Sequence, residues 1–213
     1  MTSPDFSPPH SDLLRTVATA FAVERQVLKP ELAQLLEQKE KIAAGLLLCL
    51  SLATGQKIAD VTIARLDRIY PPGRNQGAID FKLVCLLSSA TQVHLGICVL
   101  PFTDLEIVTE ICTRLLVYKD FGLDRLCLIR PGDLMTNIRQ LPACLPKLLS
   151  ANIGGHFIPL TATDVLFLLT TLSVFQQKQQ HGVTKELILA YLVQSELLTK
   201  NELIKSILIT AQS

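Results

Sequence analysis

The chain has 213 residues, of which 49% are hydrophobic and 18% are charged, and its formal net charge is +1. This composition is typical of a globular protein with a substantial core and excludes a disordered chain. The small net charge argues against a generally basic nucleic-acid-binding protein, although a local basic patch is compatible with it. The low charged fraction suggests that a protein partner or a second copy of the chain covers some apolar surface.

The cysteines and apolar runs bear on the compartment. Six cysteines lie in aliphatic runs without a Cys-x-x-Cys pair or a histidine at ligand spacing, which predicts buried free thiols in a reducing compartment. Two apolar runs resemble membrane spans, but one is too short and the other contains Pro159 and Asp164, so no membrane association is expected. Residues 1–11 lack the features of a signal peptide and predict a flexible leader. These features together predict a cytoplasmic protein.

The first half of the chain predicts two helices followed by three strands. Apolar residues at helical spacing indicate one helix over residues 12–28 and a second from Pro30 to Thr54. The period then changes to the alternation of strands, which are expected at residues 57–70, 79–87 and 93–102. The turn-forming stretches PPGRNQG and SSATQ join them, so the three strands should form an antiparallel meander.

The second half predicts a helix, a strand and then mainly helices. The helix begins at Thr103 or Asp104 and ends near Gly122, and the strand DRLCLIR follows it. A helical run broken by prolines and a loop at residues 153–156 lead to three helices, expected at 162–180, 184–197 and 199–210. Thr199 and Glu202 form a capping-box pattern before the last of them.

These elements predict an α/β (α+β) fold with an α-β-β-β-α-β core, a mixed sheet and a C-terminal helical module. The expected division is a leader at residues 1–11, an α/β domain at 12–156, and a helical module at 157–213. That module is either a small bundle or a helix-turn-helix-like unit.

One polar motif, Asp80-Phe81-Lys82, opens an otherwise apolar strand. Because strand side chains alternate, Asp80 and Lys82 are expected on the same face. An acidic residue followed by Asp-x-Lys is an arrangement with which metal-dependent nucleases bind a divalent cation. Two carboxylates converge on the cation, while the lysine polarises the attacking water.

The motif needs a second carboxylate, and two residues are candidates. Asp67 shares the strand parity of Val61 and Ile63, so it is expected on the apolar side unless the strand bulges. Asp60 has the polar-face parity and is the better companion for Asp80. The simpler alternative is that Asp60, Asp80 and Lys82 form the solvated side of a half-buried meander.

The element order resembles the core of the restriction-endonuclease-like superfamily, the PD-(D/E)xK nucleases, over about residues 31–130. The resemblance implies an acidic residue on the second core strand and an (Asp/Glu)-x-Lys motif on the third. Aligned strand by strand, Asp80 is the second-strand acid, and the third-strand motif falls near Gln92-Val93-His94, which contains no acid or lysine. This alignment implies a degenerate site.

Aligned by residue type instead, Asp67 becomes the first acid and Asp80-x-Lys82 becomes the motif. This alignment requires an additional strand before residue 58, where a helix is predicted. It implies an active nuclease.

The basic residues around the predicted fourth strand are candidate phosphate contacts, with ordinary surface charges as the alternative; they are Lys119, Arg125, Arg130 and Arg139.

The sequence favours a non-catalytic, degenerate nuclease-like protein that acts in a larger assembly, one that handles DNA, and that needs no cofactor. One alternative is a Mg²⁺-dependent nuclease in which Asp80 and Asp60 bind the metal and Lys82 assists, with Asp67 as the substitute for Asp60. The other alternative is an oligomeric scaffold unrelated to nucleic acid.

Overall fold

The protein is described by a computed structural model that covers residues 8–67, 77–100, 104–131 and 143–212. A six-stranded mixed sheet forms its centre, and its strands lie side by side in chain order. The strands are β1 (Lys57–Ile58), β2 (Val61–Asp67), β3 (Phe81–Leu87), β4 (Gln92–Val99), β5 (Arg125–Pro131) and β6 (Gly155–Leu160). The pairs from β1 to β4 are antiparallel, and β4, β5 and β6 are parallel. The predicted fold class, core order and mixed sheet are confirmed.

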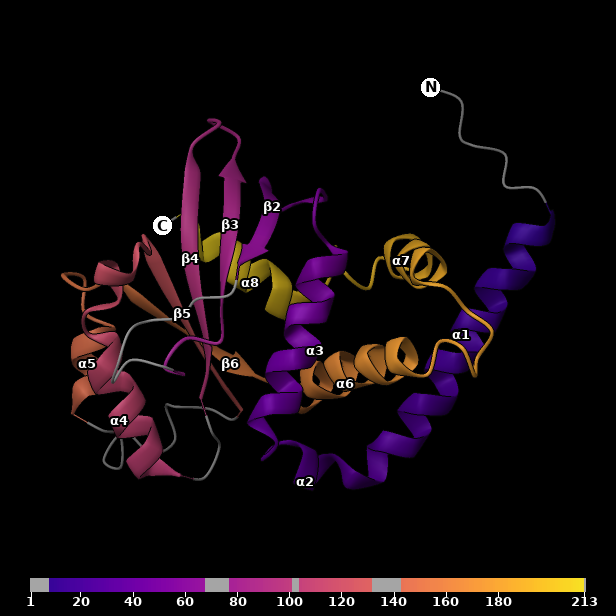
Figure 1. Cartoon of the computed structure of the whole chain (residues 1–213), viewed down its shortest axis with the longest axis horizontal. Helices are drawn as coiled ribbons and strands as arrows, with labels where there is room; N and C mark the ends of the chain where they lie inside the picture. Colours follow the sequence, from indigo (N-terminus) through magenta and orange to yellow (C-terminus); the bar gives the residue numbers. More distant parts are fainter. Residues whose placement is uncertain (1–7, 68–76, 101–103, 132–142, 213) are drawn as a thin grey trace.

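Helices cover both faces of the sheet (Figure 1). The α-helices are α1 (Pro8–Leu28), α2 (Leu32–Leu35), α3 (Lys39–Leu52), α4 (Leu105–Leu115), α5 (Cys144–Leu148), α6 (Ala162–Gln176), α7 (Lys185–Gln194) and α8 (Glu202–Thr210). Two 3₁₀ turns, η1 (Lys29–Glu31) and η3 (Tyr118–Phe121), follow α1 and α4. Helices α4 and α5 lie on one side of the sheet, while α3 and α6 lie on the other, and α1 and α7 pack beyond them.

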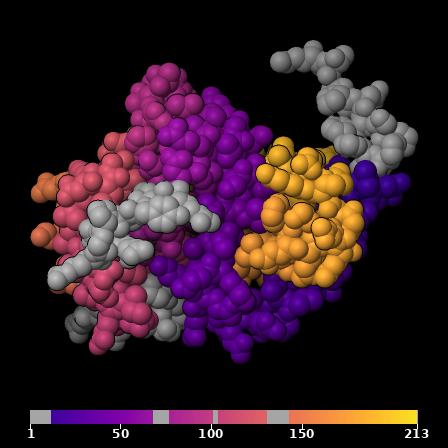
Figure 2. Space-filling model, in the orientation of Figure 1, coloured from indigo at the N-terminus to yellow at the C-terminus, as the bar shows by residue number. Residues whose placement is uncertain are grey.

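Two hydrophobic clusters hold these layers together. The larger contains one face of the sheet together with buried side chains of α1, α3, α6, α7 and α8. The smaller contains the opposite face with α4, α5 and η3. Residues before and after position 157 share the larger cluster, and the predicted domain boundary at 156 falls inside β6. In the space-filling view the segment around α7 adjoins α1, although the two are far apart in sequence (Figure 2).

Local sequence explains the starts of several helices. Asp104 caps α4, because its Oδ1 accepts a hydrogen bond from the backbone N–H of Ile107 at 3.0 Å. Thr161 and Asp164 form a capping box at the start of α6. The cap predicted for the last helix is wrong, since Asn201 rather than Thr199 accepts the N–H of Ile204. Asn is as good a cap as Thr and stands directly before the helix.

Three predicted elements differ from the structure. The predicted helix from Pro30 to Thr54 is divided into η1, α2 and α3. The predicted strand at 57–70 is interrupted at Ala59 and Asp60, whose φ angles of 50° and 63° turn the chain between β1 and β2. The predicted loop at 153–156 runs into β6, which is part of the sheet because it pairs in parallel with β5.

The six cysteines are free, as predicted, and five of them are buried. Burial raises the pKa of the Cys49 and Cys85 thiols to about 12, so both behave as small apolar side chains. Within the described ranges, no helix combines the length and the apolar content that a bilayer crossing requires.

Candidate functional site

A β-bulge in β2 determines where Asp67 points. Ile63 pairs with Cys85 of β3, but the next pair is Arg65 with Val84, so Ala64 is an extra residue in β2. The shift reverses the alternation, and Asp67 becomes the direct cross-strand partner of Lys82. The expectation from regular parity, that Asp67 points to the apolar side, is therefore corrected by the bulge.

Asp67 and Lys82 form part of a small charged group. The Nζ of Lys82 lies 3.6 Å from Oδ2 of Asp67, and the Nε of Arg65 donates to both carboxylate oxygens of Asp67 at 3.0 and 3.1 Å. The hydrogen bond from Arg65 and the positive charges of Arg65 and Lys82 hold the pKa of Asp67 below its usual value. Asp67 is therefore an anion with two cationic neighbours.

Asp80 has a structural position at the entrance of β3. Its backbone N–H donates to the carbonyl of Ile97 on β4 at 2.9 Å, and its Oδ2 accepts from the N–H of Val99 at 2.6 Å. The carboxylate thus accepts a hydrogen bond from a backbone N–H at the point where the pairing of β3 with β4 ends. Its Oδ1 lies 3.5 Å from the Nζ of Lys39, the first residue of α3, and both side chains are less than one-fifth exposed, at 18% and 17%.

Burial dominates the titration of Asp80. Desolvation raises the pKa of this carboxyl group above its usual value, and the opposing effects of Lys39 and of the Val99 N–H compensate only in part. The contacts link three segments, namely α3, the start of β3 and the end of β4. We interpret Asp80 as a residue that fixes the fold at this corner.

Asp60 lies away from the other two residues of the predicted site. It precedes β2 in the left-handed conformation, and its side chain is 76% exposed and pairs with Lys57 at 2.9 Å. The adjacent Val61 pairs with Leu87, at the opposite end of β3 from Lys82. The structure therefore brings Asp67, and not Asp60, to Lys82.

The third core strand has no counterpart of the nuclease motif beside Lys82. Gly96 of β4 pairs directly with Lys82, whereas Gln92 pairs with Leu86 near the other end of β3. A Cβ atom on Gly96 would lie 2.6 Å from Cδ1 of Leu123, so Leu123 occupies the space where a side chain at this position would project. The residues paired with Lys82 and Phe81 are thus Gly96 and Ile97 rather than the 92–94 stretch expected from the alignment.

The carboxylates of Asp80 and Asp67 are not arranged to bind a magnesium ion. Magnesium requires carboxylates that are free to bind it, but Asp80 is engaged by Val99 and Lys39, and Asp67 by Arg65 and Lys82. Across the described parts of the chain, no three His, Cys, Asp or Glu side chains form a group that would hold a metal ion.

The predicted basic residues that the structure describes lie on β5 and in η3. Arg125 and Arg130 stand five positions apart along β5, a separation of about 16 Å along a strand. Arg125 lies near His156 of β6, whose pKa is lowered by burial and by this arginine, while Arg130 lies near Cys112 of α4. Lys119 is exposed in η3, and Arg139 lies outside the described residues.

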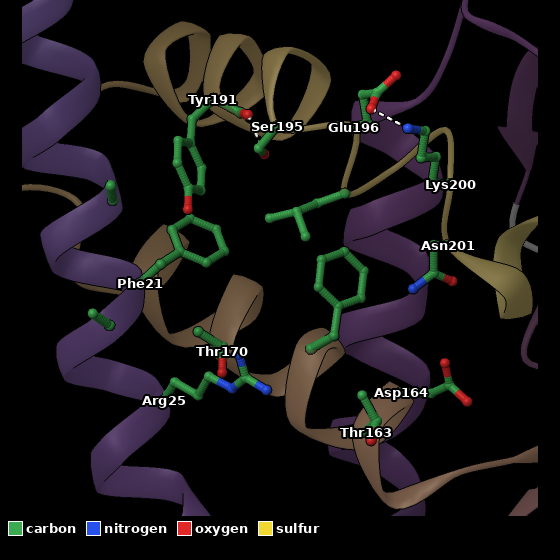
Figure 3. Close-up of a pocket in the computed structure, with 14 residues that line it drawn as sticks. Phe21, Arg25, Thr163, Asp164, Thr170, Tyr191, Ser195, Glu196, Lys200 and Asn201 are labelled. Carbon is green, nitrogen blue, oxygen red and sulfur yellow. Dashed lines mark hydrogen bonds and ion pairs between the residues drawn. The ribbon is translucent and has the colours of Figure 1, made fainter.

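A cavity that the sequence did not indicate lies at the helical end of the molecule (Figure 3). It has a volume of about 470 Å³ and is bounded by α1, α6, α7 and the loop that leads to α8. The only sequence signal on α1 is a stripe of lining residues at helical spacing, at positions 18, 21, 22 and 25. Such a stripe is also typical of ordinary helix packing.

Comparison of the chain with protein-family models, curated proteins and solved structures found no match. The resemblance to the restriction-endonuclease-like superfamily therefore stays a prediction from the order of elements and from the Asp80-Phe81-Lys82 motif.

Proposed function

We propose that this protein is a non-catalytic interaction protein in which a degenerate nuclease-like domain serves a larger assembly, one that handles DNA. The observation that carries the proposal is the closed space beside Lys82, where Leu123 stands against Gly96. A working site would need an acidic side chain on this strand, directed into an open cleft.

The contacts of Asp80 support the same proposal. Its carboxylate is bound by the N–H of Val99 and by Lys39, so its interactions serve the junction of α3 with the sheet. Catalytic carboxylates are held with lone pairs free for a metal or a water. The contacts of Asp80 are instead those of a carboxylate that stabilises the fold.

A surface on α1 supports the interaction role. Val23 and Val27 lie one turn apart on this helix and are 47% and 60% exposed. Aliphatic side chains at such spacing on an outer helix fit an apolar partner surface. Stoichiometric retention of a partner by the wild type, and its loss in a Val23→Ser and Val27→Ser double variant, would support this role. Ile209→Ser, which changes an aliphatic residue 50% exposed on α8, is the matched control.

The catalytic alternative is tested by plasmid cleavage in the presence of Mg²⁺ or Mn²⁺. Metal-dependent cleavage that is lost in both Asp80→Ala and Lys82→Met would overturn the proposal and favour the nuclease, for which the pairing of Asp67 with Lys82 is the supporting contact. The expected result is that the wild type and the variants cleave the plasmid no more than a control without protein. Equal cleavage in wild type and variants would identify a contaminating nuclease and leave the expected result in place.

The DNA-handling part of the proposal is tested separately with a fluorescently labelled duplex. Direct binding should be weak and should decrease with salt, because the chain is nearly neutral. Binding that is tight and depends on Arg125 or Lys119 would instead place the DNA contact on this chain. The molecular mass of the purified protein in solution tests the remaining alternative, because a homo-oligomeric scaffold would have a multiple of the mass of one chain.

A further inference from the structure

The cavity between α1, α6 and α7 has the size and the walls of a small-molecule site. Its volume of about 470 Å³ lies within the range of about 300 to 1,000 Å³ that is typical of ligand pockets. Two aromatic rings meet at its side, with the centroids of Phe21 and Tyr191 5.0 Å apart and the rings inclined by 42°. Phe167 and Leu197 extend the apolar wall. These side chains favour a ligand with a flat apolar body.

Thr170, in the wall of the cavity, has a buried hydroxyl group with no hydrogen-bond partner in the described parts of the chain. Thr170 is 3% exposed, and its Oγ1 has no hydrogen-bond partner among the described residues. The adjacent Thr171, by contrast, donates to the carbonyl of Phe167 at 2.9 Å, one helical turn earlier. Because a buried hydroxyl without a partner is unfavourable, Thr170 points to a polar group that the free chain does not supply.

Arg25, a cationic residue, lines the same cavity. Arg25 is exposed and forms no ion pair or hydrogen bond with any described residue. Figure 3 shows its side chain extending from α1 on the side of the cavity where Thr170 lies. The other charged lining groups are engaged, since Lys200 pairs with Glu196 at 2.5 Å and Asp164 accepts hydrogen bonds from Thr161. Arg25 is therefore the lining cation that is available to a ligand, while the hydrogen-bonded Asp164 keeps its negative charge.

We propose that this cavity binds a small monocarboxylate with an apolar ring system. The ring would lie against Phe21 and Tyr191, and the carboxylate would accept hydrogen bonds from the Arg25 guanidinium and the Thr170 hydroxyl. The carboxylates of Glu196 and Asp164 also line the cavity and disfavour a doubly charged phosphate. This site is separate from the Asp80 region and does not rest on the proposed interaction role.

Calorimetric titration of the full chain with naphthoate, and with its neutral isostere naphthamide, tests the proposal. Naphthoate should bind saturably at one site per chain, and naphthamide should bind about tenfold more weakly, because a charged hydrogen bond to the guanidinium is lost. Absence of saturable naphthoate binding at millimolar concentration, or equal affinity for the two compounds, would overturn the proposal.

Three variants locate the binding. Arg25→Gln should weaken naphthoate about tenfold and leave naphthamide unchanged, whereas Arg15→Gln, on the same helix but outside this cavity, should change neither. Ala22→Phe fills the cavity from an exposed position and should abolish binding of both compounds. Since all three positions are on the surface side of α1, circular dichroism should show an unchanged fold. Naphthoate affinity that is unchanged in Arg25→Gln, or retained in Ala22→Phe, would show that this cavity is not the site.

Discussion

At the sheet end of the molecule, Asp80 and Asp67 are fully engaged by neighbouring backbone and cationic groups, whereas at the helical end Thr170 and Arg25 have no described partner. The sheet end has the residue types of a catalytic motif, yet their contacts stabilise the fold. The helical end has no such motif, yet Thr170 and Arg25 remain available to a ligand. Residue type alone therefore does not indicate function, because a side chain whose hydrogen bonds are already satisfied by the fold has little capacity left for a ligand.

The largest effect should come from removing the partner of Asp80. Lys39→Met leaves a mostly buried carboxylate without its cation and should lower the free energy of unfolding by about 3 kcal/mol. Urea denaturation measures the change. Lys41→Met, at an exposed position two residues along α3, is the control and should be nearly neutral. If the free energy of unfolding falls equally in both variants, Lys39 does not stabilise Asp80, and the sheet end then no longer differs from the helical end in having its acid satisfied.

The next effect concerns the contact that joins the two ends. A Cβ atom at Gly45 of α3 would lie 2.9 Å from the backbone oxygen of Leu168 in α6, where neither main chain can easily move. Gly45→Ala should therefore cost about 2 kcal/mol of unfolding free energy through overpacking. Gly45→Ala would be neutral or stabilising in a helix free of this contact, since Ala is the better helix former. A gain in thermal melting temperature would thus contradict the close approach of α3 and α6.

A smaller effect of opposite sign is expected at Thr170. Thr170→Val removes a buried hydroxyl that has no described partner and should stabilise the free protein by about 1 kcal/mol. The same change at Thr171 should destabilise it, because that hydroxyl is hydrogen-bonded to Phe167. Thermal unfolding of the two variants side by side measures the difference. Loss of stability in Thr170→Val comparable to that in Thr171→Val would show that its hydroxyl is satisfied.

The smallest effect should be the pH dependence contributed by Asp80. Its pKa is raised in the folded state, so its protonated form stabilises the native protein. This contribution is fully present below the ordinary value of 3.8 and is lost as the pH rises through the raised value. Asp80→Asn keeps an oxygen that accepts from Val99 but does not titrate. The unfolding free energy of the wild type relative to this variant should therefore fall between pH 4 and neutrality, and a rise over that interval would contradict the raised pKa.

The sequence predicted the elements well because their signals are local. Alternation at the start of β3 and the helical spacing of the buried residues in α4 follow from which faces are buried. The bulge at Ala64 was not predictable, since one additional residue in a strand changes the facing of Asp67 without changing composition. The role of Asp80 depends on Val99, which is nineteen positions away in sequence and becomes its neighbour only through strand pairing.

The cavity was harder still to predict. Thr170 and Thr171 are adjacent in the same apolar run, and a threonine in a helix ordinarily donates to the carbonyl one turn earlier. Thr171 does so and Thr170 does not, a difference set by the packing around each side chain rather than by residue type.

The packing of α1 also has a consequence for the order in which the chain can fold during synthesis. Glu24 is 5% exposed and is bound by Ser173, Gln177 and His181, which follow it by 149 to 157 residues. At ribosomal rates of about 5 to 20 residues per second, these partners emerge roughly 8 to 30 s after Glu24. Helix α1 is therefore made well before the helices on which it docks, and until α6 is made its apolar face is exposed to chaperones and proteases.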